Sequence, residues 1–320
     1  MYKIAILDDY KNASLTAADW KSLPDTEITV FNEHMAGEDA LAEALAPFQI
    51  IVIMRERSPF PETLLNRLPD LKLLVTAGMR NLSVDMDTAR HNGVTVCGTQ
   101  MMRNAPFELT WALIMAITRK IPAENLSMHN GGWHESVGIG LKGKTLGILG
   151  LGRLGSEIAK VALAFDMNVI AWSQNLTEEK AAEAGVVRVE KEALFAQSDV
   201  LSIHLLLSDR TTGMVGTHEL SLMKKTAYLI NTARGPIVEE KALIAALQSR
   251  QIAGAALDVF DVEPLPSDHP FRQLDNTLLT GHVGYTIEEL YPLVYGQAVE
   301  DISHWLDGNP VRVLNSTNNS

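Results

Sequence analysis

Short apolar runs alternate with stretches of helical spacing along almost the whole chain. In the first hundred residues the strand-length runs lie at 4–7, 28–31, 50–53, 73–75 and 94–96. Segments such as 38–46 and 62–68 between them have the spacing of helices. This alternation predicts a parallel sheet with helices on both faces. Because no glycine-rich nucleotide fingerprint occurs here, we expect a flavodoxin-like domain that is not the main cofactor binder.

The alternation resumes after residue 144. The expected strands lie at 145–149, 169–172, 200–203, 227–230, 253–259 and 277–279. An apolar helical stretch at 107–119 resembles a crossover between domains, and the helical pattern at 287–306 suggests that the chain returns to the first domain. The fold class predicted is therefore α/β, with two doubly wound parallel-sheet domains. The first, a flavodoxin-like substrate-binding lid, comprises 1–102 and 286–320, and the second, a Rossmann NAD(P)-binding domain, comprises 103–285.

The segment 144–175 has the layout of a dinucleotide-binding βαβ unit: a strand, a glycine-rich turn, a helix and a second strand. In the turn, Gly150 allows a tight bend, Gly152 allows a pyrophosphate to approach the backbone, and Gly155 allows the helix to pack on the strand. The helix N-terminus then faces the phosphates. The residues predicted to contact the cofactor here are Gly150, Gly152, Arg153, Leu154 and Gly155.

The second strand of this unit ends in Ser173, Gln174 and Asn175. An acidic residue at this point binds the ribose 2′-hydroxyl of NAD, whereas an arginine accommodates the 2′-phosphate of NADP. Here neither is present, so the sequence leaves the choice of cofactor open. We expect these three residues to contact the ribose and NADPH to be accepted, with a small preference over NADH.

The composition and net charge of the chain limit the classes of partner that we expect it to bind. The 320 residues carry a formal net charge of −12, with 46% hydrophobic and 21% charged residues. This balance is that of a globular protein and disfavours nucleic acid or an anionic membrane as a partner. No apolar run has membrane-spanning length, the N-terminus does not resemble a signal peptide, and the cytoplasm is the expected compartment. The single cysteine, Cys97, lies in an apolar run and is expected to be buried.

Three charged residues follow predicted strands of the second domain. Arg234 follows 229–233, Glu263 follows 256–262, and His282 follows 278–281. In open α/β sheets, ligands bind outside the carboxyl ends of the strands. Each residue alone has an ordinary structural explanation, but three of them downstream of a dinucleotide fingerprint indicate a catalytic site.

Four motifs give the chain a specific resemblance: GILGLGRLG, MKKTAYLINTARGPIVEEKALIAAL, ALDVFDVEPLPSDHPF and LLTGHVGYT. Together they resemble the D-isomer-specific 2-hydroxyacid dehydrogenase family, which includes phosphoglycerate dehydrogenases and glyoxylate or hydroxypyruvate reductases. The similarity spans essentially the whole chain and is strongest at 141–290. It implies an NAD(P)-dependent oxidoreductase, usually a homodimer, that acts on a small anionic 2-keto or 2-hydroxy acid.

The resemblance also implies site residues. The catalytic set would be Arg234, Glu263 and His282, and further cofactor contacts would be His204, Leu205, Thr232, Ala233, Asp258 and Gly284. The chain departs from the family at three points: Gly281 stands where a proline often precedes the histidine, Leu206 replaces the proline of an H-x-P motif, and Ser173 replaces an acidic residue.

The residue types suit the expected chemistry. Arg234 can hold a carboxylate through two parallel hydrogen bonds, and it can polarise a keto oxygen. His282 can donate or accept the proton at that oxygen, and Glu263 would fix the tautomer of the ring and favour its charged form. We expect the substrate carboxylate to bind the backbone of Gly78 and Met79, and Arg55 and Arg80 to bind a second anionic group. The competing explanation for these two arginines is that they are solvated loop charges.

Two other functions fit parts of the pattern. A dinucleotide-sensing regulator, similar to the C-terminal-binding corepressors, would keep the fold and use it for protein contacts. A methyltransferase would use the glycine-rich turn for another nucleotide, but it would leave Arg234, Glu263 and His282 unexplained. No metal site is expected.

Overall fold

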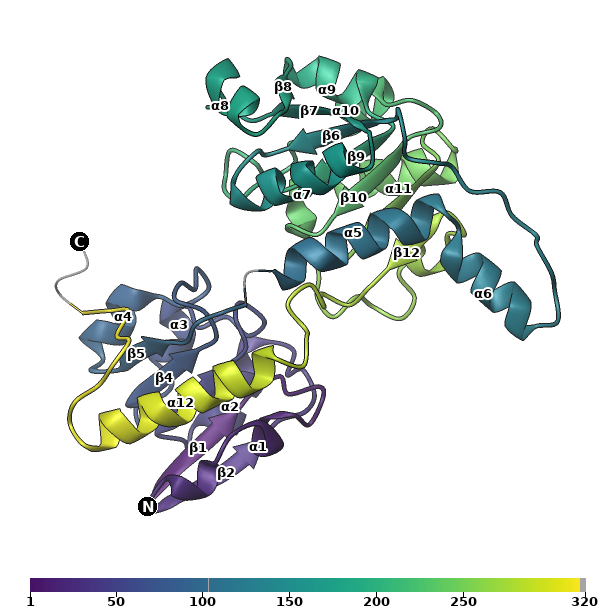
Figure 1. Cartoon of the computed structure of the whole chain (residues 1–320). Coiled ribbons are helices and arrows are strands. Elements are labelled where there is room, and N and C mark those ends of the chain that lie inside the picture. Colours follow the sequence, from purple (N-terminus) through teal and green to yellow (C-terminus); the bar gives the residue numbers. More distant parts are fainter. Residues whose placement is uncertain (103, 317–320) are drawn as a thin grey trace. The chain divides into compact units, whose positions relative to one another are not determined.

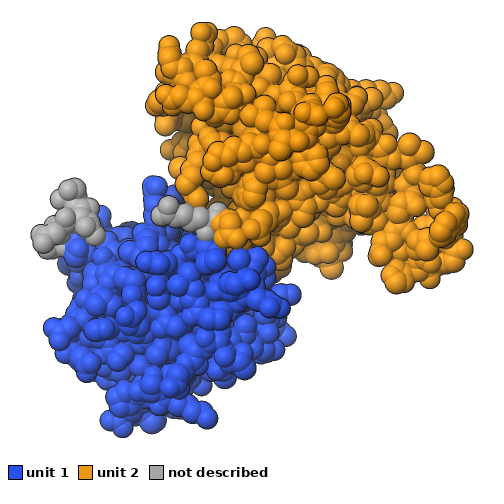
Figure 2. Space-filling view, viewed as in Figure 1, with its two compact units in different colours: residues 1–102, 286–320 blue, residues 103–285 orange. Residues whose placement is uncertain are grey.

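The computed structural model describes residues 1–102 and 104–316, and within them the chain forms two compact units (Figures 1 and 2). Unit 1 comprises Met1–Met102 and Thr286–Ser320, and unit 2 comprises Arg103–Tyr285. Residues 103 and 317–320 of the expected domain ranges lie outside the described residues. Each unit has its own sheet, so each is described by itself.

Unit 1 is built on a sheet that, within the described residues, has five strands in the order β2-β1-β3-β4-β5, all parallel. This order is that of flavodoxin-like folds. The central strands are apolar and buried along their whole length because helices cover both faces. The strands are β1 (Tyr2–Ile6), β2 (Thr26–Val30), β3 (Ile50–Ile53), β4 (Leu73–Thr76) and β5 (Thr95–Gly98). The helices are α1 (Ser14–Ala17), α2 (Glu38–Leu45), α3 (Glu62–Leu65), α4 (Met86–His91) and α12 (Leu290–Leu306), with a 3₁₀ turn at Trp20–Ser22.

Helix α12 begins at Leu290, three residues later than the pattern predicts. The reason is Pro292, which lacks an N–H and clashes inside a helix but is tolerated in its first turn. After α12, the chain runs antiparallel to β5, where Leu314 N donates to Val96 O at 2.7 Å. The guanidinium of Arg312 holds this segment to α12 through Asp301, with Nε to Oδ1 at 2.9 Å.

Unit 2 has a sheet of seven described strands in the order β12-β11-β10-β9-β6-β7-β8, again all parallel. Counted from β6, this is the 3-2-1-4-5-6 order of dinucleotide-binding folds with one strand added. The strands are β6 (Thr145–Leu149), β7 (Asn168–Trp172), β8 (Val187–Arg188), β9 (Val200–Ile203), β10 (Tyr228–Asn231), β11 (Gly254–Leu257) and β12 (Thr277–Leu279). The helices are α5 (Ala105–Thr118), α6 (Ile121–His129), α7 (Arg153–Ala164), α8 (Glu178–Glu183), α9 (Lys191–Gln197), α10 (Thr217–Leu222) and α11 (Glu240–Gln248), with 3₁₀ turns at Gly235–Ile237 and Pro270–Gln273.

The two sheets confirm the predicted fold class of two doubly wound parallel-sheet domains. In unit 2, apolar cores lie on both faces of the sheet. The strand order places the reversal point between β6 and β9, which is where such sheets bind ligands. The turns after β6, β9, β10, β11 and β12 therefore form the edge at which the candidate site is sought.

Candidate active site

The glycine-rich turn joins β6 to α7, and its glycines have different surroundings. Gly150 has φ +104°, and a Cβ there would lie 2.8 Å from the carbonyl oxygen of His204. A Cβ on Gly155 would overlap the carbonyl oxygen of Gly150, so the helix can pack this closely only without a side chain. Gly152 is different, because a Cβ there would meet nothing within 4 Å. The fold requires Gly150 and Gly155, whereas Gly152 keeps space open in front of the helix.

The neighbouring groups fit a dinucleotide at this turn. No side chain caps the N-terminus of α7 at Gly152, and Arg153 is exposed in its first turn. His204 follows β9, and its Nε2 lies 2.8 Å from Ser202 Oγ. Its Nδ1 is buried and has no hydrogen-bond partner among the described residues. Burial lowers the pKa of His204 to about 4, so the ring stays neutral and offers one polar atom at the edge where the phosphates would bind.

The other predicted cofactor residues lie along the same edge of unit 2. After β7, Ser173 is half-buried while Gln174 and Asn175 are exposed. These three side chains are neutral, so they place no charge at the end of β7. Leu154 in α7 and Leu205 after β9 are both half-buried. The set can hold an NAD(P) molecule, which when bound supplies the redox chemistry at its nicotinamide ring.

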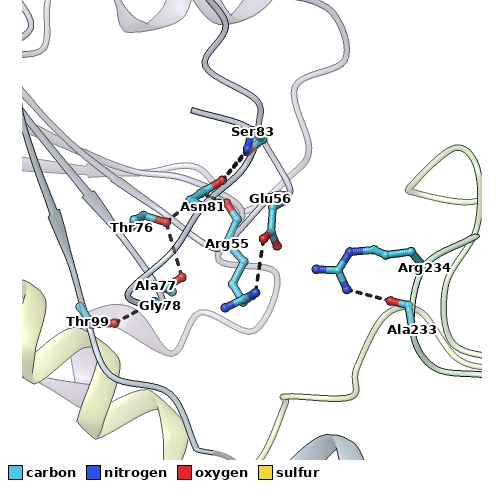
Figure 3. Close-up of polar contacts among 10 residues, drawn as sticks. All are labelled: Arg55, Glu56, Thr76, Ala77, Gly78, Asn81, Ser83, Thr99, Ala233 and Arg234. Atoms are coloured by element: carbon cyan, nitrogen blue, oxygen red, sulfur yellow. Dashed lines mark hydrogen bonds and ion pairs between the residues drawn. The ribbon is translucent and has the colours of Figure 1, made fainter. Parts of the chain in front are cut away.

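Asn231, the last residue of β10, fixes the turn that carries Arg234. Its buried side chain accepts a hydrogen bond from Ala233 N and donates one to Arg234 O, each at 3.0 Å. Arg234 Nη1 donates to Ala233 O at 2.8 Å (Figure 3). Thr232 is tied to α5, since its hydroxyl lies 2.8 Å from that of Thr110. The guanidinium is thereby supported by a rigid turn at the carboxyl edge of the sheet.

Asp258, which follows β11, supports the turn that carries His282. Its carboxylate accepts hydrogen bonds from Thr280 Oγ1 at 2.6 Å and from the backbone N–H groups of Val283 and Gly284, each at 2.9 Å. Burial raises the pKa of Asp258, although these hydrogen bonds and His282 oppose the shift. Asp258 and Gly284, both predicted to contact the cofactor, are thus bound to each other. The structure gives Asp258 a definite role in supporting the His282 turn.

His282 and Glu263 form the central pair of the site. His282 Nδ1 lies 2.5 Å from Glu263 Oε2, and the side chains are 25% and 29% exposed. Burial tends to raise the pKa of Glu263, but the hydrogen bond and charge of His282, the Phe260 N–H and Arg234 outweigh it and lower that pKa. A carboxylate on Nδ1 leaves Nε2 as the outward nitrogen for acid–base chemistry.

The predicted substrate residues of unit 1 lie near one another after β3 and β4. Arg55 has φ +53°, and its Nη2 lies 3.3 Å from Glu56 Oε1 (Figure 3). Its guanidinium also lies against Gly78, where a Cβ would be 2.5 Å from Arg55 Nη1. Met79 and Arg80 are exposed. The Gly78 N–H donates to Thr99 Oγ1 at 3.4 Å, a long contact that leaves it able to bind a better acceptor.

Sequence reasoning missed the side chains that support these turns. Asn81 is buried, and its Nδ2 donates to Arg55 O and to Thr76 Oγ1, each at 2.8 Å (Figure 3). Asn231 has the same kind of role in unit 2. The available signal was an asparagine at the end of an apolar strand or a few residues after it, a position where its side chain commonly bonds to nearby backbone.

Cys97 is buried, as expected, and burial raises the pKa of its thiol to about 12, with a further contribution from Asp301. The thiol is therefore not a nucleophile at neutral pH. Across residues 1–102 and 104–316, no helix is long and apolar enough to cross a membrane. The same residues contain no group of three or more His, Cys, Asp or Glu side chains arranged for a metal ion.

Comparison with known proteins agrees with this geometry. The family described as D-isomer specific 2-hydroxyacid dehydrogenase, NAD binding domain, matches residues 111–284. The chain is 38% identical to a glyoxylate reductase of Aeropyrum pernix over 79% of this chain and 78% of that one. It spans about half of the D-3-phosphoglycerate dehydrogenases that it matches, such as that of Archaeoglobus fulgidus, with 34% identity over 87% of this chain and 53% of that one.

Among solved structures, a phosphoglycerate oxidoreductase from Vibrio cholerae o395 is 37% identical, with a TM-score of 0.90 over 96% of this chain and all of that one. An acyclic imino acid reductase, Bsp5, in complex with NADPH and D-Arg, is 25% identical, with a TM-score of 0.71 over 97% and 99% of the two chains.

The fold and the strand-end residues define the class of dinucleotide-dependent oxidoreductases. Within that class, the chain belongs to the D-isomer-specific 2-hydroxyacid dehydrogenase family. It is an NAD(P)-dependent enzyme of this family. The corepressor-like alternative gains no support, because the relatives above are named as reductases, dehydrogenases and oxidoreductases.

Proposed function

We propose that the enzyme reduces a small 2-keto acid to the D-2-hydroxy acid, and catalyses the reverse oxidation, with His282 as the proton donor and acceptor. The observation that carries the proposal is the 2.5 Å contact between His282 Nδ1 and Glu263 Oε2 at the carboxyl edge of a dinucleotide-binding sheet. A ring held by a carboxylate on one nitrogen presents the other to the substrate oxygen. Glu263 orients the ring and fixes the role of its Nδ1 nitrogen.

Arg234 binds the carboxylate of the substrate in this proposal. Its turn is fixed by Asn231, so the guanidinium loses little freedom when a ligand binds. Two parallel N–H groups match the two oxygens of a carboxylate, and their charge also stabilises negative charge that develops on the keto oxygen. During reduction His282 gives its proton to that oxygen, and during oxidation the ring takes the proton back.

We propose that residues of unit 1 select the substrate by its charge. The Gly78–Met79 backbone would bind the carboxylate, and Arg55 and Arg80 would bind a second anionic group. Relatives named glyoxylate reductase and D-3-phosphoglycerate dehydrogenase suggest two classes of substrate, a short 2-keto acid and a phosphorylated one. A panel of glyoxylate, hydroxypyruvate, a branched 2-keto acid and 3-phosphohydroxypyruvate, each with NADH and NADPH, tests the proposal through absorbance of the reduced cofactor. Turnover of none of them would refute it.

We also propose NADPH as the slightly preferred cofactor, because the neutral end of β7 does not repel a 2′-phosphate. The enzyme is proposed to be a homodimer. Support for this comes from the region of α6 and the loop that follows it, which carries several large apolar side chains exposed to solvent: Ile121, Leu126, Met128, Trp133 and Val137. Such a surface is typical of an interface. Light scattering of the purified enzyme would give the mass of a dimer, and a monomer at micromolar concentration would contradict it.

A further inference from the structure

The segment that carries Glu263 is held together by its own contacts. We refer to residues 259–271 as the Glu263 loop. Within it, Phe260 N donates to Glu263 Oε1 at 2.9 Å, and the rings of Phe260 and Phe271 lie 6.3 Å apart. The guanidinium of Arg272 donates to the carbonyl oxygens of Leu265 and Pro266, each at 2.8 Å. Because its ends and middle are tied together, a shift of this loop would carry Glu263 with it.

One end of the loop lies directly against the turn of Arg234. A Cβ on Gly235 would overlap the carbonyl group of Phe260 and would lie 2.6 Å from Asp261 N. The two backbones thus approach as closely as a glycine allows. The position of the loop therefore fixes Glu263 relative to both His282 and Arg234.

The other end of the loop is joined to α11 by a histidine–glutamate pair. His269 Nε2 lies 3.2 Å from Glu240 Oε1, and the side chains are only 13% and 25% exposed. His269 Nδ1 accepts a hydrogen bond from Phe271 N at 3.3 Å, so the proton of the neutral ring belongs on Nε2, facing Glu240. Glu240 is the first residue of α11, which follows the Arg234 turn by a few residues. The pair closes a bridge from the loop back to that turn.

The carboxylate of Asp261, also on the loop, interacts with both members of this histidine–glutamate pair. Asp261 is exposed, yet burial of its carboxyl and the charge of Glu240 raise its pKa, and His269 opposes this shift. The three side chains are therefore close enough to interact. Asp261 and Glu240 repel each other, so the loop depends on the contact between His269 and Glu240 to stay against α11.

We propose that His269 and Glu240 are positioning residues, which clamp the Glu263 loop to α11 and so hold Glu263 on His282. This inference rests on the proposed function of Glu263 and His282. When the clamp is released, Glu263 spends less time on the ring, and the ring is held less firmly in the orientation that proton transfer needs. Reduction then slows through a lower kcat. Binding of the dinucleotide, which uses the turn after β6, is unaffected.

Two substitutions of His269 distinguish its contact with Glu240 from its hydrogen bond to Phe271 N. His269→Asn retains an acceptor near the Nδ1 position, and asparagine is a good helix N-cap, but it is too short to reach Glu240. His269→Gln extends an amide N–H group towards the Nε2 position. We expect His269→Asn to lower kcat about 10-fold, while KM and the Kd for NADPH stay near their wild-type values. His269→Gln should restore most of kcat.

The pair offers a second test that does not depend on one variant folding well. Glu240→Ala should reproduce the effect of His269→Asn, and the double variant should be no worse than either single one. His218→Asn is the matched control, because His218 and Glu192 form a similar pair at 3.4 Å on the surface, 64% and 76% exposed. It should leave kcat unchanged.

The outcomes distinguish this inference from the function on which it rests. If Glu263→Gln is as active as the wild type, the role of Glu263 is wrong. If Glu263→Gln is impaired but His269→Asn behaves like His218→Asn, the clamp alone is refuted. If KM or the Kd for NADPH changes in His269→Asn as much as kcat does, or if His269→Gln is no better than His269→Asn, the pair is merely structural and the inference is also overturned.

Discussion

The first turn after the first strand differs sharply between the two units. In unit 1, β1 leads to two aspartates and then to α1, which has four residues. Asp9 accepts hydrogen bonds from Ala13 N at 3.0 Å and Ser14 N at 2.9 Å, while Asp8 Oδ2 accepts one from Ser58 Oγ at 2.7 Å. In unit 2, β6 leads through glycines to α7, which has 12 residues and no side-chain cap.

This difference shows which of the two turns can bind an anion. Both turns lie at the carboxyl edge of a parallel sheet, so topology alone does not distinguish them. In unit 1 the protein's own carboxylate already occupies the N–H groups that begin α1. In unit 2 no side chain among the described residues caps the N–H groups at the start of α7, and the open side of Gly152 admits a phosphate. The nucleotide is therefore assigned to unit 2.

The largest effect should come from removing the histidine of unit 2, with the histidine of a similar pair in unit 1 as the control. His282→Ala removes the proton donor of unit 2, so kcat for keto-acid reduction should fall by at least about 100-fold, with cofactor affinity little changed. In unit 1, His34 lies 3.3 Å from Asp8 in a similar pair, which makes His34→Ala the matched control. Steady-state rates of both variants test this prediction. Near-normal kcat in His282→Ala would show that His282 is not the proton donor.

The second-largest effect concerns Arg234, the proposed partner of the substrate carboxylate. Arg234→Lys keeps the charge but loses the two-point geometry, so KM should rise and kcat should fall together, with kcat/KM reduced by about 10-fold or more. The measurement is a full substrate saturation curve. A fully active lysine variant would contradict the bidentate role.

Gly152→Ala sharpens the comparison of the two turns. Because a Cβ there meets nothing within 4 Å among the described residues, the melting temperature should not change, whereas a bound pyrophosphate would be displaced. We expect the Kd for NADPH, measured by fluorescence, to rise about 10-fold, the cost of roughly one lost hydrogen bond to a charged group. Gly140→Ala, which also meets nothing within 4 Å, is the control. Equal affinity in the two variants would place the phosphates elsewhere.

Ser173→Asp tests the cofactor preference. A new carboxylate at the end of β7 can pair with the ribose 2′-hydroxyl and repels a 2′-phosphate, so the ratio of kcat/KM for NADH to that for NADPH should rise. The wild type should accept NADPH with a small preference. A strong NADH preference that Ser173→Asp does not alter would show that another residue recognises the ribose.

The smallest expected effect concerns Asp301 in unit 1, and it is an effect on stability. Burial raises the pKa of this carboxyl from 3.8 to about 7, although Arg312 opposes the shift. The folded state then binds more protons than the unfolded state between these values, so the free energy of unfolding should decrease as pH rises from about 4 to about 7. In Asp301→Asn this part of the slope should disappear. Denaturant melts across that range measure it, and an unchanged slope would contradict the assignment.

Periodicity predicted the fold class because buried parallel strands are continuous apolar runs. It did not predict β8, a strand of two residues at Val187–Arg188, which is too short to show a pattern. The contact between Glu263 and His282 follows from strand order, since β11 and β12 are neighbours. The carboxylate network of Asp258 and the supports provided by Asn81 and Asn231 could not be predicted, because they depend on the exact course of loops.

The central claim is that unit 2 carries out hydride transfer to the carbonyl carbon of a 2-keto acid. The most direct measurement uses NADPH or NADH deuterated at C4 of the nicotinamide, in the transferred position, with the best keto acid from the panel. The account predicts that deuterium appears at C2 of the product, that the product has the D configuration where C2 is chiral, and that His282→Ala slows this reaction. Oxidation of the cofactor without deuterium at C2 of the product would contradict it.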